Sequence, residues 1–300
     1  MAFPEWRVAA ASVCGVSHVK ISRPCQDAHD WVTLPGGILV AAVADGSGSA
    51  ALGEVGATLA ARAVVEAICQ RWLATPTNSG SSDYPTDDSG SVENPWNAGP
   101  GAKRANDARP EAQGGARHTR PSAMETEDWR AVFSEAFSRA RDTLVSAAAA
   151  RDVPEQDLAT TLSVVVAWPD GAAAAQIGDG AVVVGDRPET VLALSTPAKG
   201  EYLNETVFLT STGALEDLPV NVWHGPVAHL ALLSDGLQML ALQMPAGVPH
   251  PPFFAPLFHY LATVGKVEMA GTDLAAFLGS PRILERADDD LTLLLAVLRR

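Results

Sequence analysis

Several short runs of this chain are apolar at nearly every position, and this feature constrains the fold more than any other. Such runs lie at 38–44, 161–168, 228–233 and 291–298. A strand that is apolar on both sides must be covered on both faces, so it belongs inside a layered structure. Two sheets packed face to face, with helices on their outer sides, meet this requirement.

The other expected elements fit the same plan. A turn at Pro169-Asp170-Gly171 predicts a hairpin of strands 161–168 and 172–177. Further strands are expected at 7–13, 181–184 and 206–210. Helical spacing of apolar residues predicts helices at 53–73, 127–150, 253–264 and 272–279. The expected fold class is therefore α+β, as a four-layer α-β-β-α sandwich of two antiparallel sheets.

One segment differs from the rest of the chain. Residues 74–126 contain no Leu, Ile or Phe and are rich in Ser, Gly, Pro, Asn and Asp. Such a stretch buries too little apolar surface to offset the entropy of ordering it. We expect a disordered polar insertion there, at about 74–126, within a single domain that spans 1–300. A docking segment for a partner is the alternative for this insertion.

Charge and cysteine content exclude several classes of protein. The net charge of −14 leaves nothing to offset repulsion from nucleic-acid phosphates. Cys14, Cys25 and Cys69 make no disulfide framework and fit a reducing compartment. The N-terminus does not read as a signal peptide, and the longest apolar runs are far short of a membrane span. We expect a cytoplasmic protein without a nucleic-acid or membrane partner.

Acidic residues recur at the ends of the apolar strands. Asp45 and Asp235 each end a strand and precede Gly, Asp179-Gly180 interrupts one, and Asp288-Asp289-Asp290 precedes the last. Neighbouring antiparallel strands bring opposite ends to the same edge of a sheet, so these carboxylates should converge. Asp-Gly is also a common turn signal, and for any one of these sites turn chemistry is the simpler explanation.

Converging carboxylates repel each other unless a cation is shared between them. Oxygen ligands without a His or Cys cluster favour Mg²⁺ or Mn²⁺ over Zn²⁺. A pair of such ions can activate water and bind a phosphoryl oxygen. The pattern of acids therefore predicts a site for metal and phosphate.

The order of motifs resembles the bacterial branch of the protein phosphatase 2C family. The motifs are GVSHVKISRPCQDAH from Gly15, VADGSGSA from Val43, TTLSVVVA with QIGDGAVV from Thr160, LLSDG from Leu232 and DDDLTLLLA from Asp288. The resemblance covers about 7–73 and 127–298. It implies two antiparallel sheets flanked by helices, and a metal-dependent protein serine/threonine phosphatase.

The resemblance also implies roles for individual residues. Asp45 would bridge two Mg²⁺ or Mn²⁺ ions, and Gly46 would offer its carbonyl to the second ion. Asp235 and Asp289 would be the remaining direct ligands of the first ion. Asp289 is preferred to its neighbours because Asp289-Asp290-Leu291-Thr292 is similar to the family's Asp-Asn-x-Thr. Asp179, with Asp235, would hold a third ion. Gln26 and Asp27 would hold waters that are bound to the metal.

The sequence departs from the family pattern at several positions. Ser47 stands where the family often has His, and serine is a poor general acid at neutral pH. Gln26 replaces a carboxylate. The family's phosphate-binding Arg would fall at Ser22, so Arg23 is the candidate and Lys20 the second choice. His18 and His29 flank the first motif, but the sequence shows no acidic partner for either.

These features favour an enzyme that removes phosphate from phosphoserine and phosphothreonine proteins, by water activated at a binuclear Mg/Mn centre. A Ser/Thr kinase and its targets are the partners that the resemblance implies. The departures leave open a catalytically weak or inactive pseudophosphatase that binds phosphoproteins. An acidic, β-rich cation-binding protein without chemistry is a weaker alternative.

Overall fold

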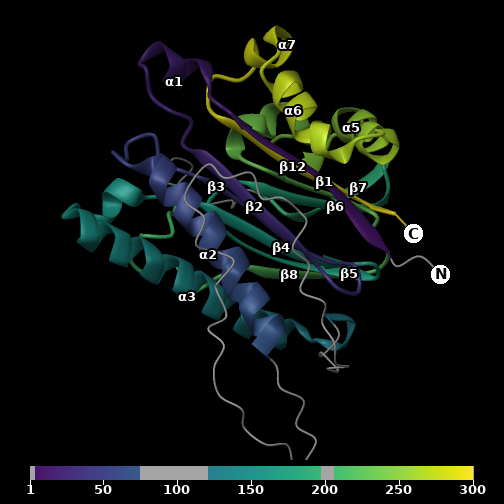
Figure 1. Cartoon of the computed structure of the whole chain (residues 1–300), viewed down its shortest axis with the longest axis horizontal. Coiled ribbons are helices and arrows are strands. Elements are labelled where there is room, and N and C mark those ends of the chain that lie inside the picture. The colour runs from purple at the N-terminus through teal and green to yellow at the C-terminus, as the bar shows by residue number, and fades with distance from the viewer. Residues whose placement is uncertain (1–3, 75–120, 197–205, 300) are drawn as a thin grey trace, which may run out of the picture.

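The computed structural model describes residues 4–74, 121–196 and 206–299. Two five-stranded antiparallel sheets pack face to face in this part of the chain, and helices cover both outer sides (Figure 1). The predicted α+β fold, with its α-β-β-α layers, is confirmed.

Each sheet mixes strands from distant parts of the sequence. The first has the order β1 (Glu5–Val13), β12 (Leu291–Arg299), β9 (His229–Leu233), β6 (Ala181–Arg187) and β7 (Thr190–Ser195). The second has the order β2 (Asp27–Leu34), β3 (Ile38–Asp45), β4 (Leu162–Trp168), β5 (Gly171–Ile177) and β8 (Val220–His224). A two-stranded ribbon joins β10 (Leu242–Gln243) to β11 (Val248–Pro249). Strand β1 pairs with β12 along its whole length, from Glu5 opposite Arg299 to Val13 opposite Leu291.

Helices lie on the outer faces of the sheets (Figure 1). Helices α2 (Gly53–Ala74) and α3 (Thr126–Arg151) cover the second sheet, and α5 (Pro251–Thr263) and α6 (Val267–Leu278) cover the first. The short helices are α1 (Val16–Lys20), α4 (Gln238–Ala241), α7 (Pro281–Leu284) and the 3₁₀ turns η1 (Pro121–Ala123), η2 (Glu155–Leu158) and η3 (Asp235–Leu237). None of the helices in the described residues is both long and apolar enough to cross a membrane.

Three apolar layers hold the sandwich together. The layer between the sheets contains Leu39, Val165 and Leu294, and each is fully buried. Aromatic rings fill the layer under α3, where Trp129 stacks on Trp168 with ring centroids 5.4 Å apart. Burial of such large apolar side chains is the main source of stability in a fold of this kind.

The elements expected from the sequence are confirmed with some exceptions. The predicted strand at 206–210 is wrong, because turn hydrogen bonds between Phe208 and Ser211 take the place of a ladder. Strands β2, β7 and β8 and helix α1 were missed, and α6 begins at Val267 rather than at 272. Most of the expected insertion at 74–126 lies outside the described residues; at its ends, α2 includes residue 74, and η1 and the first residue of α3 fall within 121–126.

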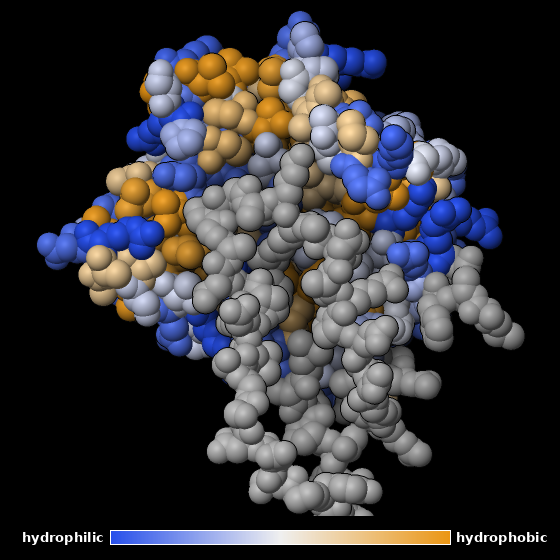
Figure 2. Space-filling view, viewed as in Figure 1, coloured by the Kyte–Doolittle hydropathy of each residue, from blue (hydrophilic) through white to orange (hydrophobic). Residues whose placement is uncertain are grey.

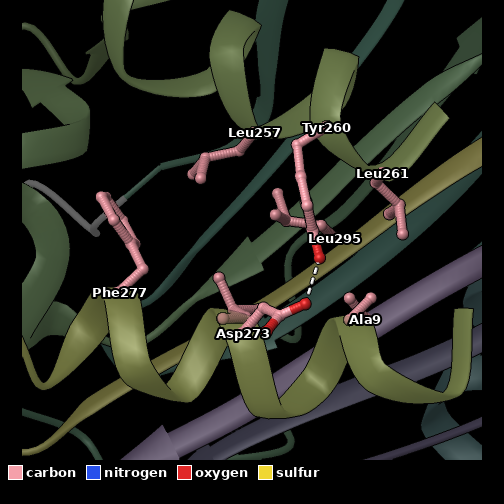
Figure 3. A pocket seen from close by; sticks show the side chains of 9 residues that line it. Ala9, Leu257, Tyr260, Leu261, Asp273, Phe277 and Leu295 are labelled. Carbon is pink, nitrogen blue, oxygen red and sulfur yellow. Dashed lines mark hydrogen bonds between the residues drawn. The ribbon is translucent and has the colours of Figure 1, made fainter. Parts of the chain in front are cut away.

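The surface and its pockets give little sign of the active site. On the face shown in Figure 2, hydrophilic residues alternate with smaller apolar patches. A pocket of about 210 Å³ lies between α5 and α6, where the Tyr260 hydroxyl donates to Asp273 (Figure 3). Its lining is mostly apolar and includes none of the carboxylates expected to bind metal.

Candidate metal centre

Strand register brings the acidic strand ends together, as the sequence predicted. Asp27 lies opposite Asp45 where β2 pairs with β3. Asp235 follows β9 and Asp289 precedes β12, and these two strands are antiparallel neighbours. The first pair belongs to one sheet and the second pair to the other, so the carboxylates meet at one end of the sandwich and span both sheets.

The carboxyl groups of Asp45 and Asp235 are in direct contact. They share a side-chain hydrogen bond, which requires a proton on one of them. Burial, followed by the charges of Asp27 and Asp235, raises the pKa of Asp45 well above its usual value. Burial also raises the pKa of Asp235 to about 6, although the hydrogen bond with Asp45 opposes that rise.

Asp27 is the most deeply buried of these acids. Burial raises its pKa to about 7, against the effect of hydrogen bonds from Ser234 and Thr292. The Ser234 hydroxyl donates to Asp27 Oδ2 at 2.7 Å, whereas Oδ1 has no hydrogen-bond partner. Ser234 therefore orients the carboxylate and leaves its other oxygen available.

Unpartnered oxygens in this cluster fit hard divalent cations. Asp27 Oδ1, Asp235 Oδ1 and Gln26 Oε1 are buried acceptors without a hydrogen-bond partner among the described residues. Buried polar atoms of this kind are rare unless an ion or water satisfies them. Oxygen-only donors, several of them anionic, match the preference of Mg²⁺ and Mn²⁺.

The backbone around Asp45 is fixed by the neighbouring strand. The amide of Asp45 donates to Thr161 Oγ1 at 3.1 Å, and its carbonyl accepts from Thr160 Oγ1 at 2.9 Å. Gly46 donates its amide to the carbonyl of Gln26 at 3.0 Å. A side chain at Gly46 would collide with the carbonyl of Gly53, so only glycine fits this position.

The remaining predicted acids lie at the rim. Asp179 lies in the turn between β5 and β6, where its Oδ2 accepts from Thr206 at 3.1 Å, and its charge contributes to the raised pKa of Asp235. Asp289 is exposed, and its Oδ1 accepts from the amide of Asp290 at 2.8 Å. Asp288 is also exposed, whereas Asp290 is buried.

Comparisons with known proteins agree with this geometry. The sequence profile described as "Protein phosphatase 2C" matches residues 14–279. The chain is 32% identical over 299 residues to Serine/threonine-protein phosphatase 3 of Escherichia coli (strain K12), covering 98% of each chain. The chain belongs to the protein phosphatase 2C family. It is accordingly a metal-dependent phosphoprotein phosphatase, a phosphoric monoester hydrolase.

Solved structures show the same fold. The serine/threonine phosphatase Stp1 from Staphylococcus aureus has a TM-score of 0.56 and 13% identity, covering 100% of this chain and 98% of that one. The catalytic domain of the phosphatase PstP, solved in complex with two manganese ions, has a TM-score of 0.52 and 14% identity, covering 99% of this chain and 100% of that one.

The loop before Asp27 carries both of the positively charged side chains that are candidates for binding phosphate. Arg23 is exposed, and its guanidinium donates to the carbonyl of Gly48, just after Asp45-Gly46. Lys20 is exposed at the end of α1. Of these two side chains, Arg23 alone has a hydrogen bond to the loop after Asp45-Gly46, among the hydrogen bonds of the described residues.

Two residues that depart from the family pattern, Ser47 and Asp290, form side-chain hydrogen bonds in the structure. The Ser47 hydroxyl bonds to that of Ser49 at 2.9 Å. Sequence reasoning found no acidic partner for His18, and this was wrong: His18 Nδ1 lies 2.8 Å from Asp290 Oδ2. Asp290 stands where the family pattern has Asn, and this extra carboxylate was the available signal for a buried partner.

Proposed function

We propose that this chain hydrolyses phosphoserine and phosphothreonine on proteins, using water activated at a binuclear Mg/Mn centre. Asp45, the carbonyl of Gly46, Asp235 and Asp289 would hold the ions. The observation that carries the proposal is the contact between the Asp45 and Asp235 carboxyls, beside a buried Asp235 oxygen that has no partner. Two manganese ions in the PstP catalytic domain support the same metal and number here.

Further residues would complete the centre. Asp179 would hold a third ion with Asp235, because it lies near enough to raise the pKa of that carboxyl. Gln26 and Asp27 would act through water, since each has a buried oxygen without a partner. We also propose that 1–300 forms a single catalytic domain.

The chemistry divides between the ions and the side chains. When bound, the ions lower the pKa of water and neutralise phosphoryl charge. Arg23 would bind the phosphate through its planar fork, which pairs phosphate bidentately. Ser234 holds Asp27 in place, and the two threonines before β4 hold Asp45. The Ser47 hydroxyl is engaged with Ser49 and is unsuited to acid catalysis.

The expected partners are phosphoserine and phosphothreonine proteins, including a Ser/Thr kinase and its targets. The net charge of −14 argues against nucleic acid. Cys14, Cys25 and Cys69 are all unpaired, which supports a reducing compartment such as the cytoplasm.

A pseudophosphatase is the second candidate, and particular residues favour it. Gln26 removes a negative charge from the centre, Ser47 replaces a better acid, and Arg23 is displaced by one position from the family register. A protein of this kind would bind phosphoproteins without turning them over.

Hydrolysis of para-nitrophenyl phosphate with Mn²⁺, with Mg²⁺ and with EDTA tests the proposal. Activity should require the metal and disappear in Asp235→Ala, whereas Asp142→Ala on the exposed face of α3 should retain it. Metal binding seen by calorimetry without turnover would favour the pseudophosphatase. Equal activity in Asp235→Ala would refute the assigned centre.

A further inference from the structure

A second group of potential metal ligands lies beside the carboxylate cluster and differs from it in chemistry. Cys14, His18 and Asp290 offer a sulfur, an imidazole nitrogen and a carboxylate oxygen, all within 4.8 Å of one another. His18 and Asp290 are buried, whereas Cys14 is partly exposed. It is the one mixed His, Cys and acid cluster of this kind in the described part of the chain.

The carboxylate of Asp290 is already held in place for this purpose. Its Oδ1 accepts from the amide of Gly15 and its Oδ2 from the amide of Gln26, both at 2.6 Å. The same Oδ2 lies 2.8 Å from His18 Nδ1, and the two side chains share a hydrogen bond. The backbone donors fix the oxygens, and only the His18 bond has to be exchanged for a metal.

The Cys14 sulfur is weakly engaged. Its contacts are with the carbonyls of Gly15 at 3.8 Å and Arg23 at 3.5 Å. Neither is a strong hydrogen bond, because thiols are weak donors. The sulfur already lies beside His18 and Asp290, so it could bind a shared ion without breaking a strong interaction.

We propose that Cys14, His18 and Asp290 form a site for a thiophilic divalent cation, with Zn²⁺ as the best match. Thiolate, imidazole and carboxylate are the ligands that Zn²⁺ takes, at about 2.0–2.3 Å from the ion, and three protein ligands leave a fourth position open. Mg²⁺ and Mn²⁺ prefer the oxygen-only centre. Cys14 would bind as the thiolate and give up its thiol proton to solvent, and His18 would bind as the neutral imidazole through the ring nitrogen that carries no proton.

The site would act on the loop that carries Arg23. Cys14 precedes α1 and His18 lies in it, and the amide of Arg23 donates to the His18 carbonyl at 2.9 Å. Asp290 is joined to Asp289 at the start of β12. A bound ion would therefore tie this loop to the strand that follows Asp289, and the proposal does not depend on turnover at the catalytic centre.

Cobalt titration tests the proposal, because Co²⁺ bound by a thiolate gives a near-ultraviolet charge-transfer band and oxygen ligands give none. Reduced full-length protein is titrated with Co²⁺ in excess Mg²⁺, which occupies the oxygen-only centre. The band should saturate at one equivalent and disappear on addition of Zn²⁺. Cys14→Ser should abolish the band, and Cys69→Ala, on the buried face of α2, should keep it.

His18→Asn is a second variant, chosen to keep the hydrogen bond to Asp290 so that the protein still folds. Its side-chain amide can still donate to Asp290 but replaces the imidazole ligand, so Co²⁺ should bind at least about tenfold more weakly. Absence of the band in wild-type protein, or an unchanged band in Cys14→Ser, would overturn the proposal. Unchanged affinity in a folded His18→Asn protein would do the same.

Discussion

Replacing Asp45 by Asn should stabilise the metal-free protein while abolishing its activity. Asp45 contacts Asp235 and lies near the charges of Asp27 and Asp289, and its burial raises its pKa well above 3.8. Asn keeps the shape and can donate to Asp235, but it carries no charge and needs no proton. The substitution therefore relieves the repulsion and removes a proposed bridging ligand at once.

The raised pKa of Asp45 sets an upper limit on the gain in the free energy of unfolding. A carboxyl of ordinary pKa 3.8 that stays protonated in the folded state at pH 7 destabilises the fold by at most about 4 kcal/mol, since each pH unit contributes about 1.4 kcal/mol. The Asn amide is also partly buried and the cluster relaxes, so we expect about 1–3 kcal/mol, or roughly 3–9 °C in Tm. Because the folded-state pKa is raised, the gain is absent below pH 4 and grows as the pH rises.

Thermal denaturation in EDTA at pH 5 and pH 7 measures this effect, with Asp142→Asn on the exposed face of α3 as the control. Added Mn²⁺ should then raise the Tm of wild-type protein and leave Asp45→Asn nearly unchanged. An apo Asp45→Asn protein no more stable than wild type at pH 7 would show that the carboxylates are not in conflict, and the reasoning would fail.

Other substitutions test the surrounding structure. Gly46→Ala should destabilise the protein by about 1–3 kcal/mol in urea, because its Cβ would meet the carbonyl of Gly53; wild-type stability would contradict this close approach. Trp129→Ala should cost about 3–5 kcal/mol, because the ring is fully buried against Trp168, and Trp129→Phe should cost less; equal losses would count against the stacking. Burial lowers the pKa of His29 to about 4, so the unfolded chain binds its proton more tightly and stability falls from pH 6.5 to 4. His29→Gln should flatten this fall by about 2–3 kcal/mol in urea titrations, and an unchanged slope would refute it.

The sequence predicted the central strands well and the edge strands poorly. Strands β3, β4 and β9 are buried along nearly all their length, so they appear as continuous apolar runs. Strands β2 and β8 lie at sheet edges and are only partly buried, which leaves a mixed composition without a clear period. An apolar run indicates burial on both faces, and an edge strand has less to bury.

Asp45 and Asp235 belong to different sheets and meet through the face-to-face packing of those sheets. The meeting of Asp235 and Asp289 could be predicted, because they lie at opposite ends of neighbouring antiparallel strands. The bond between His18 and Asp290 could not, since it joins residues 272 positions apart through the packing of a five-residue helix. Local periodicity carries no information about such a contact. The charge at Asp290, in place of the family's Asn, indicated only that some donor had to be nearby.

The pairing of β1 with β12 has a consequence for synthesis on the ribosome. Glu5 finds its partner only when Arg299 has emerged, so β1 must wait for β12 before its ladder can form. Contacts between such distant segments form late in folding. Asp289, two residues before β12, joins Asp45 and Asp235 in the same late step, so a nascent chain that lacks β12 cannot assemble the proposed metal centre. The order of strands in the first sheet thus delays assembly of the proposed centre until β12 has been made.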